Sequence, residues 1–146
     1  MKSTASAVWD GGLKDGKGKL TGGTGVFTDT PYTFAKRFEG TGGGTTPEEL
    51  IAAAHAGCFA MATSGELNKA GFTPTRLSVK ATVTLEPVDG RSTVSSSALE
   101  IEAVVPGIDD TKFQEIAAAA KAGCPISRLL KANITLTAKL SSAVLR

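Results

Sequence analysis

The sequence predicts an α+β domain built from strands, one long helix, and further strands and helices. Three observations predict it: a glycine-rich first part with short strand-like segments, a long apolar helix that starts at a capping motif, and two later segments in which apolar and polar residues alternate. The order favours α+β rather than a doubly wound parallel sheet. With 146 residues and no linker or internal repeat, the chain is expected to form one domain over residues 1–146.

The first part is expected to consist of turns that join short strands. Residues 1–44 hold 11 of the 17 glycines, together with the single Trp and the single Tyr. Strands are expected over residues 4–9, 18–21 and 32–38, followed by a loop over 40–46.

A capping box then starts the long helix. Thr46 offers a hydroxyl, Pro47 suits the first helical position, and Glu49 stands at the third position. The helix is expected over residues 47–69, with Gly71 as its stop, and it is apolar almost all round, as in a protein core. Its small residues leave room for a second helix, although a helix buried under a sheet has the same pattern.

The second half alternates strands with helices. Apolar residues recur at every second position over 77–85 and 99–105, which is typical of strands with one wet face. The Asp89-Gly90 pair between them predicts a hairpin with antiparallel neighbours. We then expect a helix from Asp109 or Asp110 to Gly123, a short helix that begins at Cys124-Pro125, and a last strand over 134–140.

Composition excludes several classes of function. The 16 basic residues exceed the 14 acidic ones by only two, which is too few to indicate nucleic-acid binding or an anionic lipid partner. The longest apolar run, 50–63, is shorter than the roughly 20 residues of a membrane span, and residues 1–10 lack the core of a signal peptide. No phosphate-binding loop or serine-hydrolase elbow is present. We expect a cytoplasmic protein without a membrane segment, nucleic acid or cofactor.

The two cysteines are the residues most suited to chemistry. Two cysteines in a cytosolic chain indicate redox or metal chemistry, and equally fit two buried small apolar residues. Cys124 would stand at the start of the third helix, where unpaired N–H groups favour a thiolate. Cys58 lies in the middle of the long helix, where burial raises its pKa, so it needs a neighbouring cation. Arg37 is a candidate.

A metal site is the main alternative use of the same residues. His55 and Cys58 are three positions apart on one helical face and could join Cys124 around an ion. The absence of a second Cys or His pair makes this a weak pattern, and His55 is better interpreted as a packed or hydrogen-bonded core histidine. No metal is therefore expected.

Five segments of the chain form a recognisable set: Tyr32-Thr-Phe-Ala-Lys-Arg37-Phe-Glu-Gly, Thr46-Pro-Glu-Glu-Leu-Ile-Ala-Ala-Ala-His-Ala-Gly-Cys58-Phe, Ala70-Gly-Phe-Thr-Pro, Val105-Pro-Gly-Ile-Asp and Ala120-Lys-Ala-Gly-Cys124-Pro-Ile-Ser. Together they resemble the osmotically inducible protein C (OsmC) family, within the OsmC and organic hydroperoxide resistance superfamily, and closer to the OsmC branch. One departure is Thr46, where relatives often carry Asn; both residues cap helices.

The resemblance implies a thiol peroxidase that reduces hydroperoxides. Cys58 then looks like the peroxidatic cysteine and Cys124 like the resolving one, with Arg37 and Glu48 as the polar pair beside the reactive thiol. The external reductant would be a dithiol, of lipoyl type in the family. The implied fold is an intertwined homodimer with antiparallel sheets wrapped around two long central helices.

Helix geometry adds a reason for a dimer. Glu48 and Cys58 are ten residues apart on one predicted helix, hence roughly 15 Å apart along its axis and about 80° apart around it. If both act at one site, Glu48 must come from a second copy of the helix. We therefore expect two sites, each with Cys58 and Cys124 of one subunit and Arg37 and Glu48 of the other. A non-catalytic dimer that binds a hydrophobic ligand remains the third interpretation.

Overall fold

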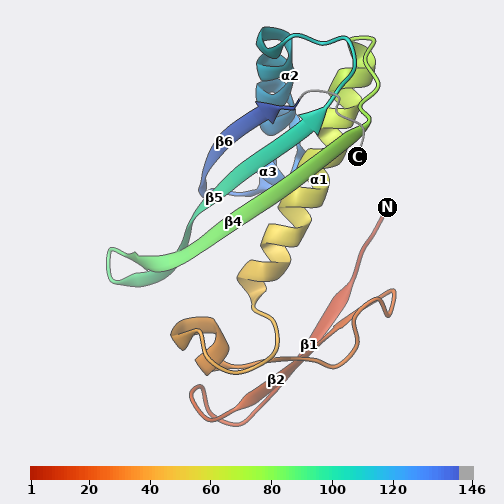
Figure 1. Cartoon of the computed structure of the whole chain (residues 1–146). Coiled ribbons are helices and arrows are strands. Elements are labelled where there is room, and N and C mark those ends of the chain that lie inside the picture. The colour runs from red at the N-terminus through yellow and green to blue at the C-terminus, as the bar shows by residue number, and fades with distance from the viewer. Residues whose placement is uncertain (142–146) are drawn as a thin grey trace. The chain divides into compact units, whose positions relative to one another are not determined.

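Two three-stranded sheets and four helical segments make up residues 1–141, the part of the chain that the computed structural model describes (Figure 1). The chain divides into two compact units, Met1–Leu50 and Ile51–Arg146. The predicted α+β class is confirmed. The boundary falls within the first turn of the long helix.

The first unit contains an antiparallel sheet in the order β1 (Ala5–Asp10), β2 (Lys17–Gly22) and β3 (Thr30–Tyr32). Gly18 on the central strand lies opposite both Trp9 and Tyr32, whose ring centroids are 5.4 Å apart. A Cβ at Gly18 would come within 2.3 Å of the Tyr32 ring, so a side chain there would push the two rings aside. The first two predicted strands are confirmed.

The prediction of a strand over 32–38 is wrong. β3 ends at Tyr32, and a short π-helix, η1 (Ala35–Glu39), follows and closes at Gly40 with φ 71°. The Lys36 N–H donates to the Thr33 hydroxyl at 3.1 Å, and the Phe34 and Phe38 rings pack with centroids 4.8 Å apart. These local contacts favour a helical turn over an extended chain.

The long helix α1 (Pro47–Lys69) starts as predicted but with half of the capping box. The Glu49 N–H donates to the Thr46 hydroxyl at 3.0 Å, which satisfies one free donor of the first turn. The Glu49 carboxylate does not return the contact to Thr46; it accepts the hydroxyl of Thr45 instead.

One face of α1 is buried and the helix ends in a glycine motif. His55, Phe59, Thr63 and Leu67 recur every four residues and are each 0% exposed. After the helix, Gly71 adopts φ 88°, and its N–H donates to Asn68 while the next N–H donates to Leu67. This closure is a Schellman motif, which leaves few carbonyls of the last turn without a partner.

The second unit contains the sheet β4 (Arg76–Val88), β5 (Arg91–Val104) and β6 (Asn133–Leu140), in that order. The predicted hairpin joins β4 and β5 through Asp89 and Gly90, with φ 51° and 75°, as a type I′ turn requires. β5 begins eight residues before the segment predicted at 99–105.

The expectation of purely antiparallel sheets is wrong for this second sheet, because β6 pairs with β5 in parallel. Between β5 and β6 the chain forms α2 (Asp110–Gly123) and α3 (Pro125–Leu129), both close to their predicted bounds. A helical crossover of this length returns the chain to the same end of the sheet, so the next strand runs parallel to the last.

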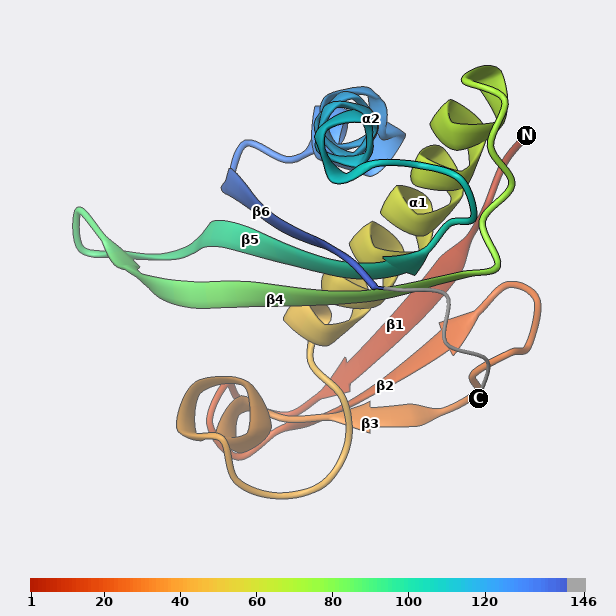
Figure 2. The same cartoon turned by 45° about the horizontal axis from the view of Figure 1, so that its top comes forward.

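Helices α1 and α2 cover the same face of this sheet (Figure 2). The core between them joins apolar side chains of α1, β5 and α2: Phe59, Leu67, Leu99, Ile101, Phe113 and Ile116. The side chain of Asp109 caps α2 by accepting the Lys112 N–H at 2.8 Å. The second half of α1 and the first half of α2 therefore share one core with β5.

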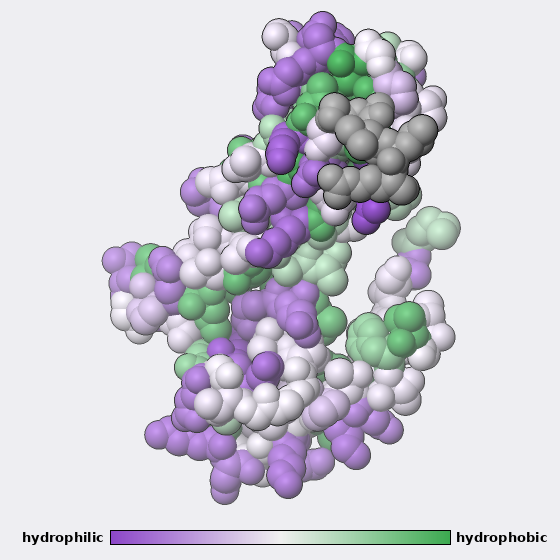
Figure 3. All heavy atoms as spheres, in the orientation of Figure 1, coloured by the Kyte–Doolittle hydropathy of each residue, from purple (hydrophilic) through white to green (hydrophobic). Residues whose placement is uncertain are grey.

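Hydrophobic residues are interspersed with hydrophilic ones on the face drawn in Figure 3. Large exposed apolar side chains in the described part of the chain include Val8, Leu13, Val26 and Met61. Within residues 1–141, no helix is long and apolar enough to cross a bilayer.

Candidate active site

Cys58 and Cys124 meet in the core of the second unit. Cys58 lies halfway along α1 and is partly buried, whereas Cys124 is 0% exposed between α2 and α3. Their sulfur atoms are 2.8 Å apart, and both thiols are free. The structure therefore brings together two residues that are 66 positions apart in the sequence.

Backbone geometry explains why Cys124 faces α1. Its N–H donates to the Ala120 carbonyl at 2.9 Å and ends α2, while Pro125 starts α3 immediately afterwards. The backbone of Cys124 is extended, with φ −57° and ψ 125°, so the chain turns sharply here. As a result, Cys124 stands immediately before the first turn of α3.

The two thiols have opposite pKa shifts. Burial, followed by the hydrogen bond with Cys124, raises the pKa of Cys58 above its ordinary value. Burial also acts to raise the pKa of Cys124, but hydrogen bonds from the Cys58 thiol, the Ser127 N–H and hydroxyl, and the Ile126 N–H outweigh it and lower that pKa.

The proton between the sulfurs is best placed on Cys58. The contact geometry alone lets Cys124 donate to Cys58, but the donors around Cys124 favour a thiolate there, with Cys58 as a further donor. Within residues 51–141 the second arrangement, a Cys124 thiolate that accepts from the Cys58 thiol, is favoured, because several N–H and O–H groups lower the pKa of Cys124. A thiolate on Cys58 then requires a positive charge, and residues 51–141 place none beside it.

Arg37 and Glu48 form a second pair, in the first unit. The Arg37 Nη2 and Nε atoms lie 2.7 Å and 3.1 Å from Glu48 Oε1, and Nε lies 3.3 Å from Oε2. Glu48 is buried, and the guanidinium also lies over the Phe38 ring, 5.3 Å from its centroid. The carboxylate thus fixes the direction of the guanidinium by a two-pronged ion pair.

His55 is a hydrogen-bonded core residue, as the sequence indicates. Its Nδ1 lies 2.6 Å from the Ser97 hydroxyl and its Nε2 lies 2.8 Å from the Ser127 hydroxyl. Burial lowers the pKa of His55, so the ring is neutral. With both nitrogens engaged, His55 has no free lone pair for a metal, and residues 1–141 contain no cluster of three or more possible metal ligands.

Comparison with known proteins identifies the family. The family model for OsmC-like proteins matches residues 40–139. The chain is 51% identical to Peroxiredoxin OsmC of Escherichia coli (strain K12) over 136 residues, 93% of this chain and 94% of that protein. The chain belongs to the OsmC family.

Two more distant relatives are named organic hydroperoxide resistance proteins. The organic hydroperoxide resistance protein of Xanthomonas axonopodis pv. citri is 30% identical over 77% of this chain and 79% of its own length. The crystal structure of the organic hydroperoxide resistance protein OhrB of Bacillus subtilis matches with a TM-score of 0.68 at 25% identity, over 94% of this chain and 98% of that chain. The higher identity to an OsmC protein favours the OsmC branch.

Two site residues were missed in the sequence. Ser127 stands three positions after Cys124 at the start of a helix, where its hydroxyl can turn back toward the cysteine; this spacing could have indicated it. Ser97 shares a strand face with Leu99 and Ile101, both buried. A serine on the buried face of a strand needs a hydrogen-bond partner, and that partner is His55.

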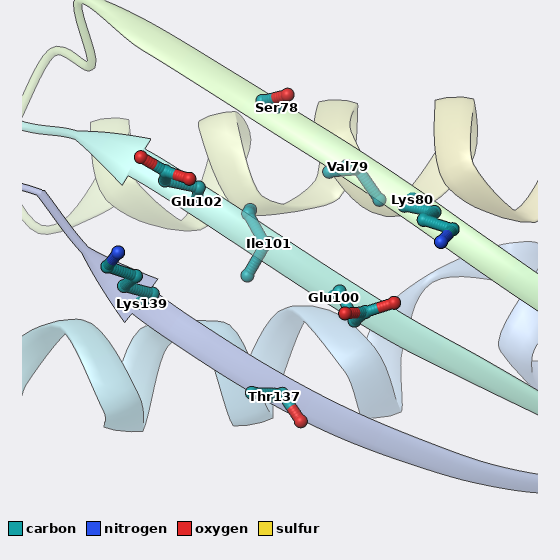
Figure 4. A pocket seen from close by; sticks show the side chains of 8 residues that line it. All are labelled: Ser78, Val79, Lys80, Glu100, Ile101, Glu102, Thr137 and Lys139. Atoms are coloured by element: carbon teal, nitrogen blue, oxygen red, sulfur yellow. The ribbon is translucent and has the colours of Figure 1, made fainter.

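A recess of about 280 Å³ on the sheet is not a candidate site (Figure 4). It lies on the sheet face that carries Lys80, Glu100, Glu102 and Lys139. Lys80 is opposite Glu100 and Glu102 is opposite Lys139 in the strand register. Such alternating charges stabilise neighbouring strands at a solvated surface and leave no net charge for a ligand.

Proposed function

We propose that this chain reduces hydroperoxides, organic ones and hydrogen peroxide, with Cys58 as the peroxidatic and Cys124 as the resolving cysteine. It is a thiol-dependent peroxidase of the OsmC family. The observation that carries the proposed chemistry is the pair of free thiols, Cys58 partly buried and Cys124 buried, with sulfurs 2.8 Å apart. The relatives' names add a role in peroxide stress.

The first step needs a thiolate on Cys58. Its sulfur attacks one oxygen of the peroxide, the S–O bond forms, the O–O bond breaks, and the leaving alkoxide takes up a proton to become an alcohol. A guanidinium beside Cys58 would shift the thiolate from Cys124 to Cys58, with the Cys124 S–H then donating to it. The same guanidinium would donate to the oxygen that becomes negative.

The second step removes the sulfenic acid. The Cys124 thiolate attacks the Cys58 sulfur and expels hydroxide, which is protonated to water, leaving a Cys58–Cys124 disulfide. The short contact means that neither helix has to move far for this bond to form. An external dithiol, of lipoyl type in our proposal, then exchanges with the disulfide and restores both thiols.

The charge for the first step is proposed to come from a second subunit. Glu48 and Cys58 both lie on the continuous helix α1, so one chain's Glu48 is about 15 Å along the axis from its own Cys58. The face of α1 that is exposed in the single chain carries small apolar residues, Ala53, Ala54 and Gly57, and the larger Met61. A second α1 that packs there would bring its own Arg37 and Glu48 toward Cys58.

Thiol counting after one equivalent of an organic hydroperoxide tests the chemistry. We expect the loss of both free thiols and of two hydrogen atoms by intact mass. Cys58→Ser should keep its remaining thiol, and Met61→Leu, as a control for methionine oxidation, should behave like the wild type. Two unreacted thiols would refute the peroxidase mechanism and favour the ligand-binding alternative; stoichiometric bound metal would favour the metal alternative.

Mixing two inactive variants tests the shared site. A dimer of one Cys58→Ser chain and one Arg37→Ala chain keeps one intact site only if the two residues act across subunits. Random exchange of equal amounts should then restore about a quarter of the wild-type activity. No recovery in a sample that contains the mixed dimer would place Arg37 and Cys58 of one chain in one site.

A further inference from the structure

A chain of hydrogen bonds leads from β5 through α1 to Ser127 on α3, three positions after Cys124. Ser97 on β5 contacts Nδ1 of His55, and Nε2 of His55 contacts Ser127 on α3. Ser127 stands three positions after Cys124, and its N–H and hydroxyl act to lower the pKa of that cysteine. Ser97 and His55 are 0% exposed, so solvent does not replace these contacts.

Counting protons settles the direction of every bond when Cys124 is a thiolate. A serine hydroxyl has one hydrogen, so Ser127 can donate to the sulfur only if it accepts from His55. His55 must then carry its proton on Nε2. Because the buried ring is neutral, Nδ1 has a lone pair and accepts the Ser97 hydroxyl.

The other tautomer of His55 breaks this arrangement. With the proton on Nδ1, the ring donates to Ser97 and its Nε2 must accept the Ser127 hydroxyl. That hydroxyl then points away from Cys124, and the thiolate loses a donor. The state of His55 and the charge of Cys124 are therefore linked through a single rotating hydroxyl.

We propose that His55 and Ser127 are positioning residues for the resolving cysteine: the Nε2–H of His55 holds the Ser127 hydroxyl toward Cys124 and so stabilises its thiolate for attack on the Cys58 sulfenic acid. The proposal rests on the peroxidase function proposed above for its role in turnover. The Ser97 hydroxyl contributes by keeping the required tautomer of His55.

Few other titratable groups face Cys124. Within residues 51–141, the titratable groups that face Cys124 are Cys58 on α1 and, through Ser127, His55 on the same helix. No charged side chain in that part of the chain forms a hydrogen bond with Cys124, Cys58 or His55. A change in the Cys124 titration after substitution of Ser127 therefore reports the relay.

The first experiment titrates the Cys124 thiol alone. In a Cys58→Ser chain Cys124 is the single cysteine, so ultraviolet thiolate absorbance against pH measures it without any peroxide. We expect Ser127→Ala and His55→Leu to move the titration to higher pH, and His55→Gln, whose amide can still donate to Ser127, to restore part of the shift. Thr63→Val is the matched control, because it removes a buried α1 hydroxyl whose bond goes to the Phe59 carbonyl.

The second experiment follows disulfide formation in the two-cysteine protein at several pH values. If Ser127→Ala lowers the thiolate fraction tenfold at neutral pH, each thiolate becomes more nucleophilic, and the net rate falls about threefold. At alkaline pH the variant should match or exceed the wild type. A structural displacement of Cys124 would instead slow the reaction at every pH.

An unchanged Cys124 titration in Ser127→Ala overturns the proposal, as does an equal shift in Thr63→Val. If His55→Leu does not fold, Ser127→Ala on α3 decides alone, since its side chain lies at a half-buried position. If the Cys124 titration does not shift, peroxide can still consume both thiols of the wild type. If peroxide consumes neither thiol, the Cys124 titration can still shift in Ser127→Ala. The two proposals can therefore fail separately.

Discussion

Replacing Arg37 with Lys separates the charge of this side chain from its shape. Lysine keeps the positive charge, but its ammonium is a point donor and cannot grip both oxygens of Glu48. In the structure the Nη2 contact at 2.7 Å and the Nε contacts at 3.1 Å and 3.3 Å hold the guanidinium plane. Arg37→Lys removes at least one of these charge-assisted bonds.

The size of the effect follows from the exposure of the pair. A hydrogen bond to a charged group contributes about 1.5–3 kcal/mol. The Arg37 side chain is 36% exposed and that of Glu48 is 9% exposed, so water screens one end of the pair and the lower value applies. A loss of about 1.5 kcal/mol in the transition state corresponds to a rate about tenfold lower.

A single-turnover measurement isolates the relevant step. In a Cys124→Ser background the first reaction with peroxide is oxidation of Cys58. Rapid mixing with peroxide and chemical trapping of the sulfenic acid measure the rate of this step. Arg76→Lys, at an exposed position at the start of β4, makes the same chemical change elsewhere and should keep the full rate. A wild-type rate in Arg37→Lys, or equal slowing in Arg76→Lys, would remove the Arg37 fork from the mechanism.

Three further outcomes follow from the same structure. Cys124→Ser should consume about one equivalent of peroxide and then advance to the sulfinic acid, which intact mass detects; sustained turnover would contradict the resolving role. Phe59→Ala, at a 0% exposed position, should lower the free energy of unfolding by about 3–5 kcal/mol, against less than about 1 kcal/mol for Val88→Ala on the exposed hairpin. Because burial lowers the pKa of His55, the unfolded chain binds more protons below about pH 6.5, and stability should fall as pH drops through that range. Urea unfolding at neutral pH and at about pH 5.5 should show a smaller fall for His55→Gln; an identical fall would mean that His55 is not the group responsible.

Local signals in the sequence were reliable predictors of structure. The capping residues at Thr46, the alternation before and after the Asp89-Gly90 turn and the stop at Gly123 all correspond to observed element boundaries. Each of these signals acts within a few residues, so it needs no information about the rest of the chain.

The segment after Tyr32 shows where a local pattern misleads. Its aromatic residues fit a strand, yet Phe34 and Phe38 are four positions apart, which is helical spacing, and Gly40 provides the positive φ that ends a helix. The Thr33 hydroxyl adds a capping contact. Read together, these four residues predict the helical turn.

Other features depend on tertiary structure. The first half of β5, residues 91–98, contains serines and little apolar alternation, and it forms a strand because it pairs with β4. The parallel pairing of β6 depends on the helical crossover, and the contacts between His55, Ser97 and Ser127 join three elements far apart in sequence. The sequence therefore pointed to the two cysteines that the structure brings together, but not to the two serines that contact His55.

The two cysteines are far apart in the sequence, and this affects the thermal stability of the oxidised protein. A covalent bond between Cys58 and Cys124 would close a ring over 66 sequence positions, and a ring of that size restricts the unfolded chain by about 4 kcal/mol. The oxidised molecule should therefore melt at a higher temperature than the reduced one. Each catalytic cycle would then alternate between a more stable, oxidised form and a less stable, reduced form of the same fold. A thermal unfolding curve would therefore measure the fraction of molecules that hold the disulfide.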